Sequence, residues 1–201
     1  MDNLQTVLTN CANQKKLVEI YTDKEDSFSV GIPLYLDKNG LLVSSINTQG
    51  KTDGCAYYSF AIIEKVETET EYLQKLTYYQ DFWREQGNAT LFPLKEGAFE
   101  PPAGQNLLWH ILNQQQNARH IITIENDRTG ELETGFLVVL TEESLVLQTI
   151  DLSNAKFMGK IQLSLHTIHF VEFNSMDHHL LEYANHCLEM QKIRTKPVSH
   201  R

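Results

Sequence analysis

The sequence predicts a mainly β protein with flanking helices, made of two tandem copies of a small, strongly bent, five-stranded antiparallel barrel. Three observations lead to this prediction. The chain of 201 residues aligns with itself, its short apolar runs alternate with polar turns, and each group of such runs lies between two segments of helical periodicity. This length is enough for two small domains.

The internal repeat is the strongest of these observations. When residues 4–46 are laid over residues 108–150, nine pairs are identical, where average composition gives about two or three by chance. After one inserted residue the match continues at an offset of 105 instead of 104. The identical pairs are Leu4 and Leu108, Leu8 and Leu112, Asn13 and Asn117, Ile20 and Ile124, Asp23 and Asp127, Gly31 and Gly135, Leu36 and Leu140, Leu41 and Leu145, Ile46 and Ile150, then Ile63 and Ile168, Val66 and Val171, Glu67 and Glu172.

Each copy begins with an amphipathic helix, expected over 3–12 and 106–115, and continues with five short strands. Gly31 and Gly135 lie in the middle of the second strand, where glycine usually marks a sharp bend, so we expect the same curvature in both copies. The expected strands are 17–22, 28–36, 40–46, 55–63 and 65–68, and then 120–125, 132–140, 144–150, 160–168 and 170–173.

A second helical segment follows each group of strands, over 68–86 and 175–194, with apolar residues at helical spacing. Between the copies lies a stretch rich in proline and glycine, which is typical of a linker. We therefore divide the chain into a first barrel unit with its following helix (1–86), a linker (87–104), a second barrel unit with its following helix (105–194) and a basic tail (195–201).

Composition excludes several classes of protein. The net charge of −9 argues against a general nucleic-acid binder, because such binding depends on neutralising phosphates. The three cysteines have no metal or disulfide spacing, and the first residues carry no basic region, so we expect a cytoplasmic protein without a membrane segment. Catalytic fingerprints are absent as well, and we expect neither an enzyme nor a cofactor.

One short element resembles a ligand motif without completing it. Asp151-Leu152-Ser153 resembles the DxS element of PilZ barrels, which bind cyclic dinucleotides. The glycine that this element requires three residues after the serine is Lys156, and no RxxxR precedes it at a suitable distance. We therefore expect no small-molecule substrate from this motif.

The repeated unit resembles the Sm-like family, of the LSm and Hfq type. The match is the stretch Gly31-IPLYL-Asp37-KNG-LLV, with a mid-strand glycine, an acid six residues later, a tight turn and an apolar third strand. The resemblance implies two tandem Sm-like barrels and an RNA-binding alternative, with Asp37 and His166 as candidate contacts. Basic residues near the end of the chain add to these candidates: Lys192, Arg194 and Lys196.

Histidines supply the other candidate chemistry. If residues 164–172 form one strand, alternation places His166 and His169 on opposite faces, so they cannot share a metal. On the last helix, His179, Glu182 and His186 lie near one face, next to His178, at a spacing that suits a divalent metal. Such a cluster could equally be a polar helix face or a pH-sensitive patch.

These observations favour a non-enzymatic scaffold or regulatory protein, which binds a protein partner or a second copy through barrel edges and helical faces. An RNA-binding regulator of the Sm-like type is the alternative. A protein that binds a metal or a small ligand through the helix at 178–186 is the second alternative.

Overall fold

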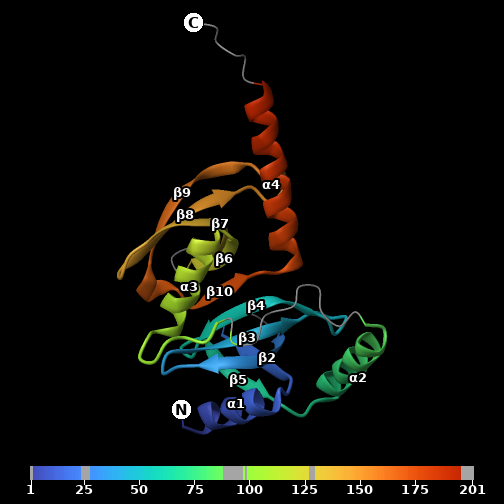
Figure 1. Cartoon of the computed structure of the whole chain (residues 1–201). Helices are drawn as coiled ribbons and strands as arrows, with labels where there is room; N and C mark the ends of the chain where they lie inside the picture. The colour runs from blue at the N-terminus through green and yellow to red at the C-terminus, as the bar shows by residue number, and fades with distance from the viewer. Residues whose placement is uncertain (1, 24–27, 88–96, 98, 127–129, 196–201) are drawn as a thin grey trace, which may run out of the picture.

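The structure is a computed structural model that describes residues 2–23, 28–87, 97, 99–126 and 130–195. Within these residues, ten strands form one continuous, open antiparallel sheet in the order β5-β1-β2-β3-β4-β10-β6-β7-β8-β9, flanked by four α-helices (Figure 1). The prediction of a mainly β protein with flanking helices is confirmed. The two groups of strands, however, belong to a single sheet, because an edge strand of one group pairs with an edge strand of the other.

The elements follow the predicted order in both halves. The first half contains α1 (Asp2–Gln14), β1 (Val18–Thr22), β2 (Phe28–Leu36), β3 (Gly40–Ile46), β4 (Thr52–Ser59), β5 (Ile63–Glu67) and α2 (Glu71–Glu85). The second contains α3 (Leu107–Ala118), β6 (Ile121–Asn126), β7 (Glu131–Leu140), β8 (Ser144–Ile150), β9 (Phe157–Ser164), the 3₁₀ turn η1 (Leu165–Thr167), β10 (Phe170–Phe173) and α4 (Met176–Thr195). None of the described helices is long and apolar enough to span a bilayer.

The pairing register repeats between the halves. The order β5-β1-β2-β3-β4 in the first half matches β10-β6-β7-β8-β9 in the second. Gly40 pairs with Ser59 in the first half, and Ser144 pairs with Ser164 in the second. The offset is therefore 104 at the third strand and 105 at the fourth, and the inserted residue lies in the turn between them.

Close contact between strands explains the two glycines within strands. A Cβ atom on Gly31 would lie 2.9 Å from the carbonyl oxygen of Ser44, and one on Gly135 would lie 2.2 Å from that of Gln148. A side chain at either position would therefore push the neighbouring strand away. A β-bulge follows each glycine in the same strand, consistent with local bending.

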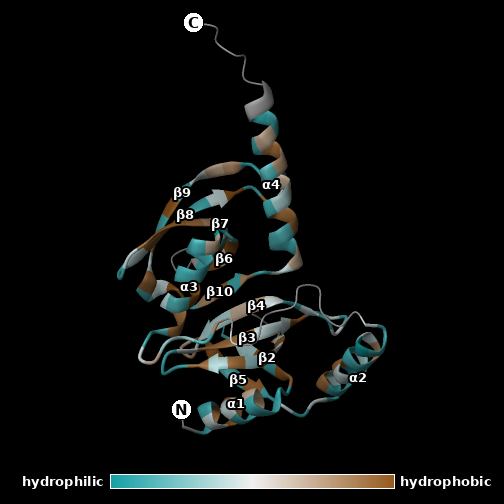
Figure 2. Ribbon diagram, viewed as in Figure 1, coloured by the Kyte–Doolittle hydropathy of each residue, from teal (hydrophilic) through white to brown (hydrophobic). Residues whose placement is uncertain are grey.

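The halves meet where β4 pairs with β10, from Tyr58 opposite Phe170 to Cys55 opposite Phe173. Apolar residues, brown in Figure 2, line β3 and β10 at this junction. Tyr57 of the first half and Phe173 of the second are both fully buried in one shared cluster with α3. Phe99, from the predicted linker, packs edge-on against Phe173 at a ring separation of 5.1 Å.

The buried residues of two further apolar clusters come from the first half, and Phe170 of β10 packs against one of these clusters. One lies beneath α1 and contains Leu8 and Ile20. The other lies beneath α2, where Leu73 and Leu76 pack on Val30. Each helix thus covers the sheet with one apolar side and leaves its other side exposed. Most of the predicted linker, 88–96 and 98, lies outside the described residues.

Candidate functional site

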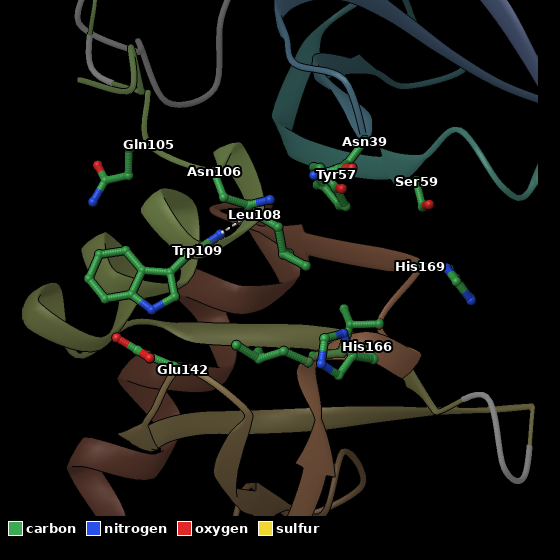
Figure 3. A pocket seen from close by; sticks show the side chains of 12 residues that line it. Asn39, Tyr57, Ser59, Gln105, Asn106, Leu108, Trp109, Glu142, His166 and His169 are labelled. Carbon is green, nitrogen blue, oxygen red and sulfur yellow. Dashed lines mark hydrogen bonds between the residues drawn. The ribbon is translucent and has the colours of Figure 1, made fainter. Parts of the chain in front are cut away.

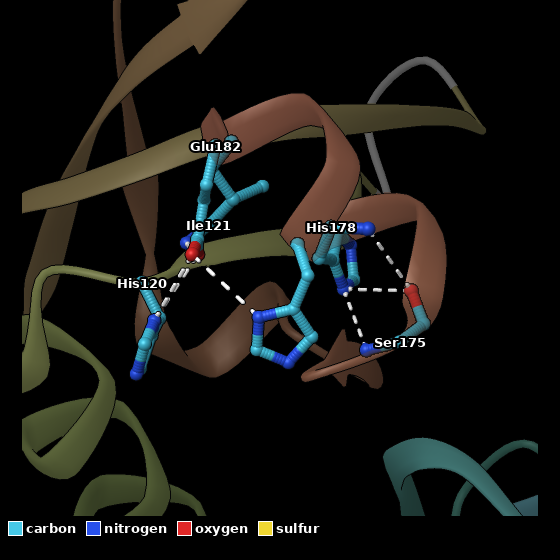
Figure 4. Close-up of polar contacts among 6 residues, drawn as sticks. His120, Ile121, Ser175, His178 and Glu182 are labelled. Atoms are coloured by element: carbon cyan, nitrogen blue, oxygen red, sulfur yellow. Dashed lines mark hydrogen bonds and ion pairs between the residues drawn. The ribbon is translucent and has the colours of Figure 1, made fainter. Parts of the chain in front are cut away.

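Glu182 anchors α4 to the beginning of β6. Its Oε1 accepts a hydrogen bond of 2.6 Å from the backbone N–H of Ile121 (Figure 4). Both of its carboxylate oxygens lie 3.2 Å from Nδ1 of His120, and Oε2 lies 3.9 Å from Nδ1 of His179. The carboxylate therefore has an orienting role between the last helix and the sheet.

The predicted metal ligands are only partly gathered by this arrangement. His179 and Glu182 lie together, whereas the exposed His186 lies a full turn further along α4. In the described part of the chain, no group of three or more His, Cys, Asp or Glu residues is placed to hold a metal ion. His120, which faces Glu182 from 62 residues away, gave no signal in the sequence.

His178 is a buried joint between α4 and β6. The residue is 4% exposed, and its Nε2 lies 2.9 Å from Oγ1 of Thr123. Its Nδ1 lies 3.0 Å from Oγ of Ser175 (Figure 4). Burial lowers the pKa of His178 to about 4, and the neighbouring His179 adds to this shift. At the offset of 105, His178 matches Leu73, a buried residue beneath α2. The ring is thus a neutral, hydrogen-bonded part of the interior.

The stretch 164–172 is not one strand, so the expected alternation of its histidines is wrong. β9 ends at Ser164, the 3₁₀ turn η1 follows, and β10 begins at Phe170. A 3₁₀ turn has three residues per turn, which removes the two-residue period of a strand. As a result, His166 and His169 both line one cavity, beside the junction of the halves (Figure 3).

This cavity, of about 630 Å³, combines polar and aromatic side chains from both halves. Asn39 and Tyr57 come from the first half, and Trp109 on α3 faces them from the second (Figure 3). Burial and the nearby carboxylate of Asp37 raise the pKa of Tyr57, so its hydroxyl stays protonated at neutral pH.

Asp37, a candidate RNA contact, makes structural hydrogen bonds. Its Oδ1 accepts from the backbone N–H groups of Asn39 at 2.7 Å and Gly40 at 2.9 Å, which closes the turn between β2 and β3. Its Oδ2 accepts at 3.0 Å from the backbone N–H of Leu107, the first residue of α3. The carboxylate therefore joins the first half to a helix of the second.

The basic candidates lie apart from His166 along the chain and on another element. Lys192 is exposed on α4 and pairs with Glu189 of the same helix, and Arg194 lies in the last turn of that helix. Lys196 lies outside the described residues. Among the described residues, the cavity beside His166 is lined by no lysine or arginine.

An exposed aromatic surface lies on α2. Tyr78, Tyr79 and Phe82 are 62%, 40% and 52% exposed. Trp83 holds this surface in place, since its Nε1 donates a hydrogen bond of 2.7 Å to the carbonyl oxygen of Gln49 and its ring packs against Phe82. We call Tyr78, Tyr79 and Phe82 the α2 aromatic face.

Comparisons with known proteins leave the chain without a family. No family model matches it, and no curated protein matches it in sequence. Two solved structures of MrkH from K. pneumonia align over most of their length. The apo structure is 9% identical over 95% of both chains with a TM-score of 0.17, and the P2(1) crystal is 10% identical over 96% of this chain and 94% of that chain with a TM-score of 0.18. At these TM-scores the likeness carries no argument about this chain.

Proposed function

We propose that the chain is a non-enzymatic scaffold of two tandem Sm-like units, which binds a protein partner through exposed helical faces. The α2 aromatic face is the observation that carries this proposal. Exposed aromatic side chains that are already held in place suit protein interfaces, because binding them costs little conformational entropy.

The repeat places a second apolar surface on α4. Tyr183, which matches Tyr78 at the offset of 105, is 71% exposed, and Leu180 on the same helix is 59% exposed. The hydrogen bonds of Glu182 and His178 fix this helix against β6. Both helices therefore present an exposed tyrosine at the equivalent position, which supports binding by helical faces.

The two edge strands of the sheet, β5 and β9, are less favourable than the helical faces for binding a protein partner. β5 carries Glu64, Lys65 and Glu67 in a five-residue strand, and short charged strands protect an edge from pairing. β9 is longer and exposes Phe157 and Met158, at 41% and 71%. We therefore propose β9 as the edge available for self-association.

Site-specific photocrosslinking in cells tests the helical faces. A photoreactive phenylalanine analogue replaces Tyr78 or Tyr183, with Glu64 as an exposed control position in β5. We expect a protein crosslinked at 78 or 183 that is absent at 64. Light scattering of the purified chain then assigns the crosslink to a second copy or to a different protein. A strict monomer with equal, background labelling at all three positions would refute the scaffold.

Binding of single-stranded RNA is the second candidate function, and the cavity beside His166 favours it. Trp109 offers a ring for stacking, and the amides of Asn39 and Gln105 offer hydrogen bonds to a base edge. Titration of a labelled RNA oligomer across a salt series tests this candidate, with Trp109→Leu as the variant. Absence of binding at low salt eliminates it.

A further inference from the structure

A second, larger cavity lies where the two halves of the molecule meet, lined by strands of the first half, by α2 and by residues of β6, β7 and β10. Its volume is about 990 Å³, within the range of small-molecule sites. Strands β1 to β4 supply half of its lining residues, Tyr72 of α2 supplies one side, and Phe170 and Glu172 of β10 supply another. Neither the scaffold proposal nor the RNA alternative uses it.

Four aromatic residues line the cavity, in two packed pairs. Tyr58 and Phe170 pack at a ring separation of 5.2 Å with tilted planes. Phe28 and Tyr72 pack at 5.2 Å in an edge-to-face arrangement. Aliphatic residues, among them Ile46, also line the cavity. An apolar group of a ligand would therefore contact aromatic as well as aliphatic residues.

The charged residues that line the cavity are all acidic. Glu125 and Glu172 line the cavity, and the described lining contains no lysine, arginine or histidine. Glu172 is partly withdrawn from solvent, and burial, with the nearby Asp53 and Asp177, raises its pKa. A positive charge in the cavity would relieve this unfavourable burial, whereas a negative charge would add to it.

We propose that this cavity binds an organic cation with apolar substituents, of the tertiary or quaternary ammonium class. Ring faces carry negative potential and attract such cations at short range. The carboxylate of Glu172 supplies the opposite charge, and the aliphatic wall takes up the substituents. Anionic ligands such as nucleotides are disfavoured by the same lining.

Calorimetric titration with phenyltrimethylammonium and with its neutral isostere tert-butylbenzene tests the charge requirement. We expect the cation to bind at least about tenfold more tightly than the neutral compound. Glu172→Gln keeps the shape of the side chain and should weaken cation binding about tenfold. Glu64→Gln removes an equally negative, exposed carboxylate of β5 and should leave the affinity unchanged.

Amide chemical shifts in the same titration locate the compound. We expect the perturbed amides to lie around Tyr58 and Phe170, and Phe170→Leu to weaken binding of the cation. Equal affinity for the two compounds, no binding of the cation at millimolar concentration, or perturbations confined to other regions would each overturn the proposal. A Glu172→Gln variant that binds as tightly as the unchanged chain would do the same.

Discussion

Replacing Asp37 by alanine should destabilise the protein more than the matched replacement in the second half. Asp37 accepts two hydrogen bonds within its own turn and a third from the first residue of α3. Thr141, at the same position of the repeat, accepts from the N–H of Ser144 at 3.0 Å, and within the described part of the chain its hydrogen bonds stay inside its own turn. Comparing the two variants therefore distinguishes the stability that comes from closing the turn from the stability that comes from the contact between the halves.

The expected loss of stability depends on which backbone N–H groups each side chain caps. Loss of a capping side chain typically costs about 1 kcal/mol, which is the expected cost of Thr141→Ala. Asp37→Ala loses a turn cap and a helix cap, together with a negative charge at the N-terminus of α3, which contributes roughly 0.3–1 kcal/mol. We therefore expect a cost of about 2–3 kcal/mol for Asp37→Ala.

Equilibrium unfolding in urea, followed by circular dichroism, measures both costs. If Asp37→Ala lowers the free energy of unfolding by no more than Thr141→Ala does, the contact with α3 contributes nothing and the reasoning fails. The same variants address the RNA alternative. A side chain that served only to contact RNA would change RNA affinity without changing the unfolding midpoint.

Two further predictions concern α4. As pH falls from 6.5 toward 4, the His178 side chain takes up a proton in the unfolded chain but not in the folded one, where it is buried. The free energy of unfolding should therefore fall by up to about 3 kcal/mol over this range. His178→Leu, which copies Leu73, should flatten this part of the melting temperature against pH, and an unchanged slope would contradict the assignment. Glu182→Ala should lower the free energy of unfolding by about 2 kcal/mol and speed hydrogen exchange of the Ile121 amide. An unchanged exchange rate would show that the hydrogen bond between Glu182 and Ile121 does not hold α4 on the sheet.

Local sequence patterns predicted the elements because they depend on neighbours in the chain. Alternation and helical spacing are set by which side of an element is buried, so they identified the strands around Gly31 and the helix with Leu73 and Leu76. Comparing the copies also revealed that the offset between them changes from 104 to 105 between the third and fourth strands. The pairing of Ser59 with Gly40 and of Ser164 with Ser144 reproduces this change.

Contacts between distant segments left no such trace. The pairing of β4 with β10 depends on two strand edges that the sequence describes separately, so two barrels were expected where one sheet forms. The 3₁₀ turn at Leu165–Thr167 interrupts a stretch whose apolar and polar residues alternate as in a strand, and this changes the direction of the His166 side chain. Glu182 met His120 and Ile121 only through the fold, since 61 or more residues separate them.

The joint between the last helix and the first strand shows how the copies diverged while keeping one geometry. In the first half, buried Glu19 accepts a hydrogen bond from Thr70, whose hydroxyl caps α2 by accepting from the N–H of Leu73.

In the second half, Thr123 stands in the place of Glu19 and Ser175 in the place of Thr70, and His178 bridges them. A buried acid that accepts from the hydroxyls of Thr70 and Tyr21 in the first half thus corresponds to two hydroxyls bridged by a neutral imidazole in the second, and each set satisfies its own polar atoms.

Because both joints connect a strand to the first turn of a helix, they fix the direction in which α2 and α4 leave the sheet. The exposed tyrosines Tyr78 and Tyr183 lie about two turns beyond Thr70 and Ser175, where these joints begin. Their positions relative to the sheet therefore depend on a few buried polar contacts, and the second set weakens in acid because His178 must then take up a proton. A partner that contacts both helices would consequently lose affinity as the pH falls below 6.5, whereas a partner of α2 alone would not.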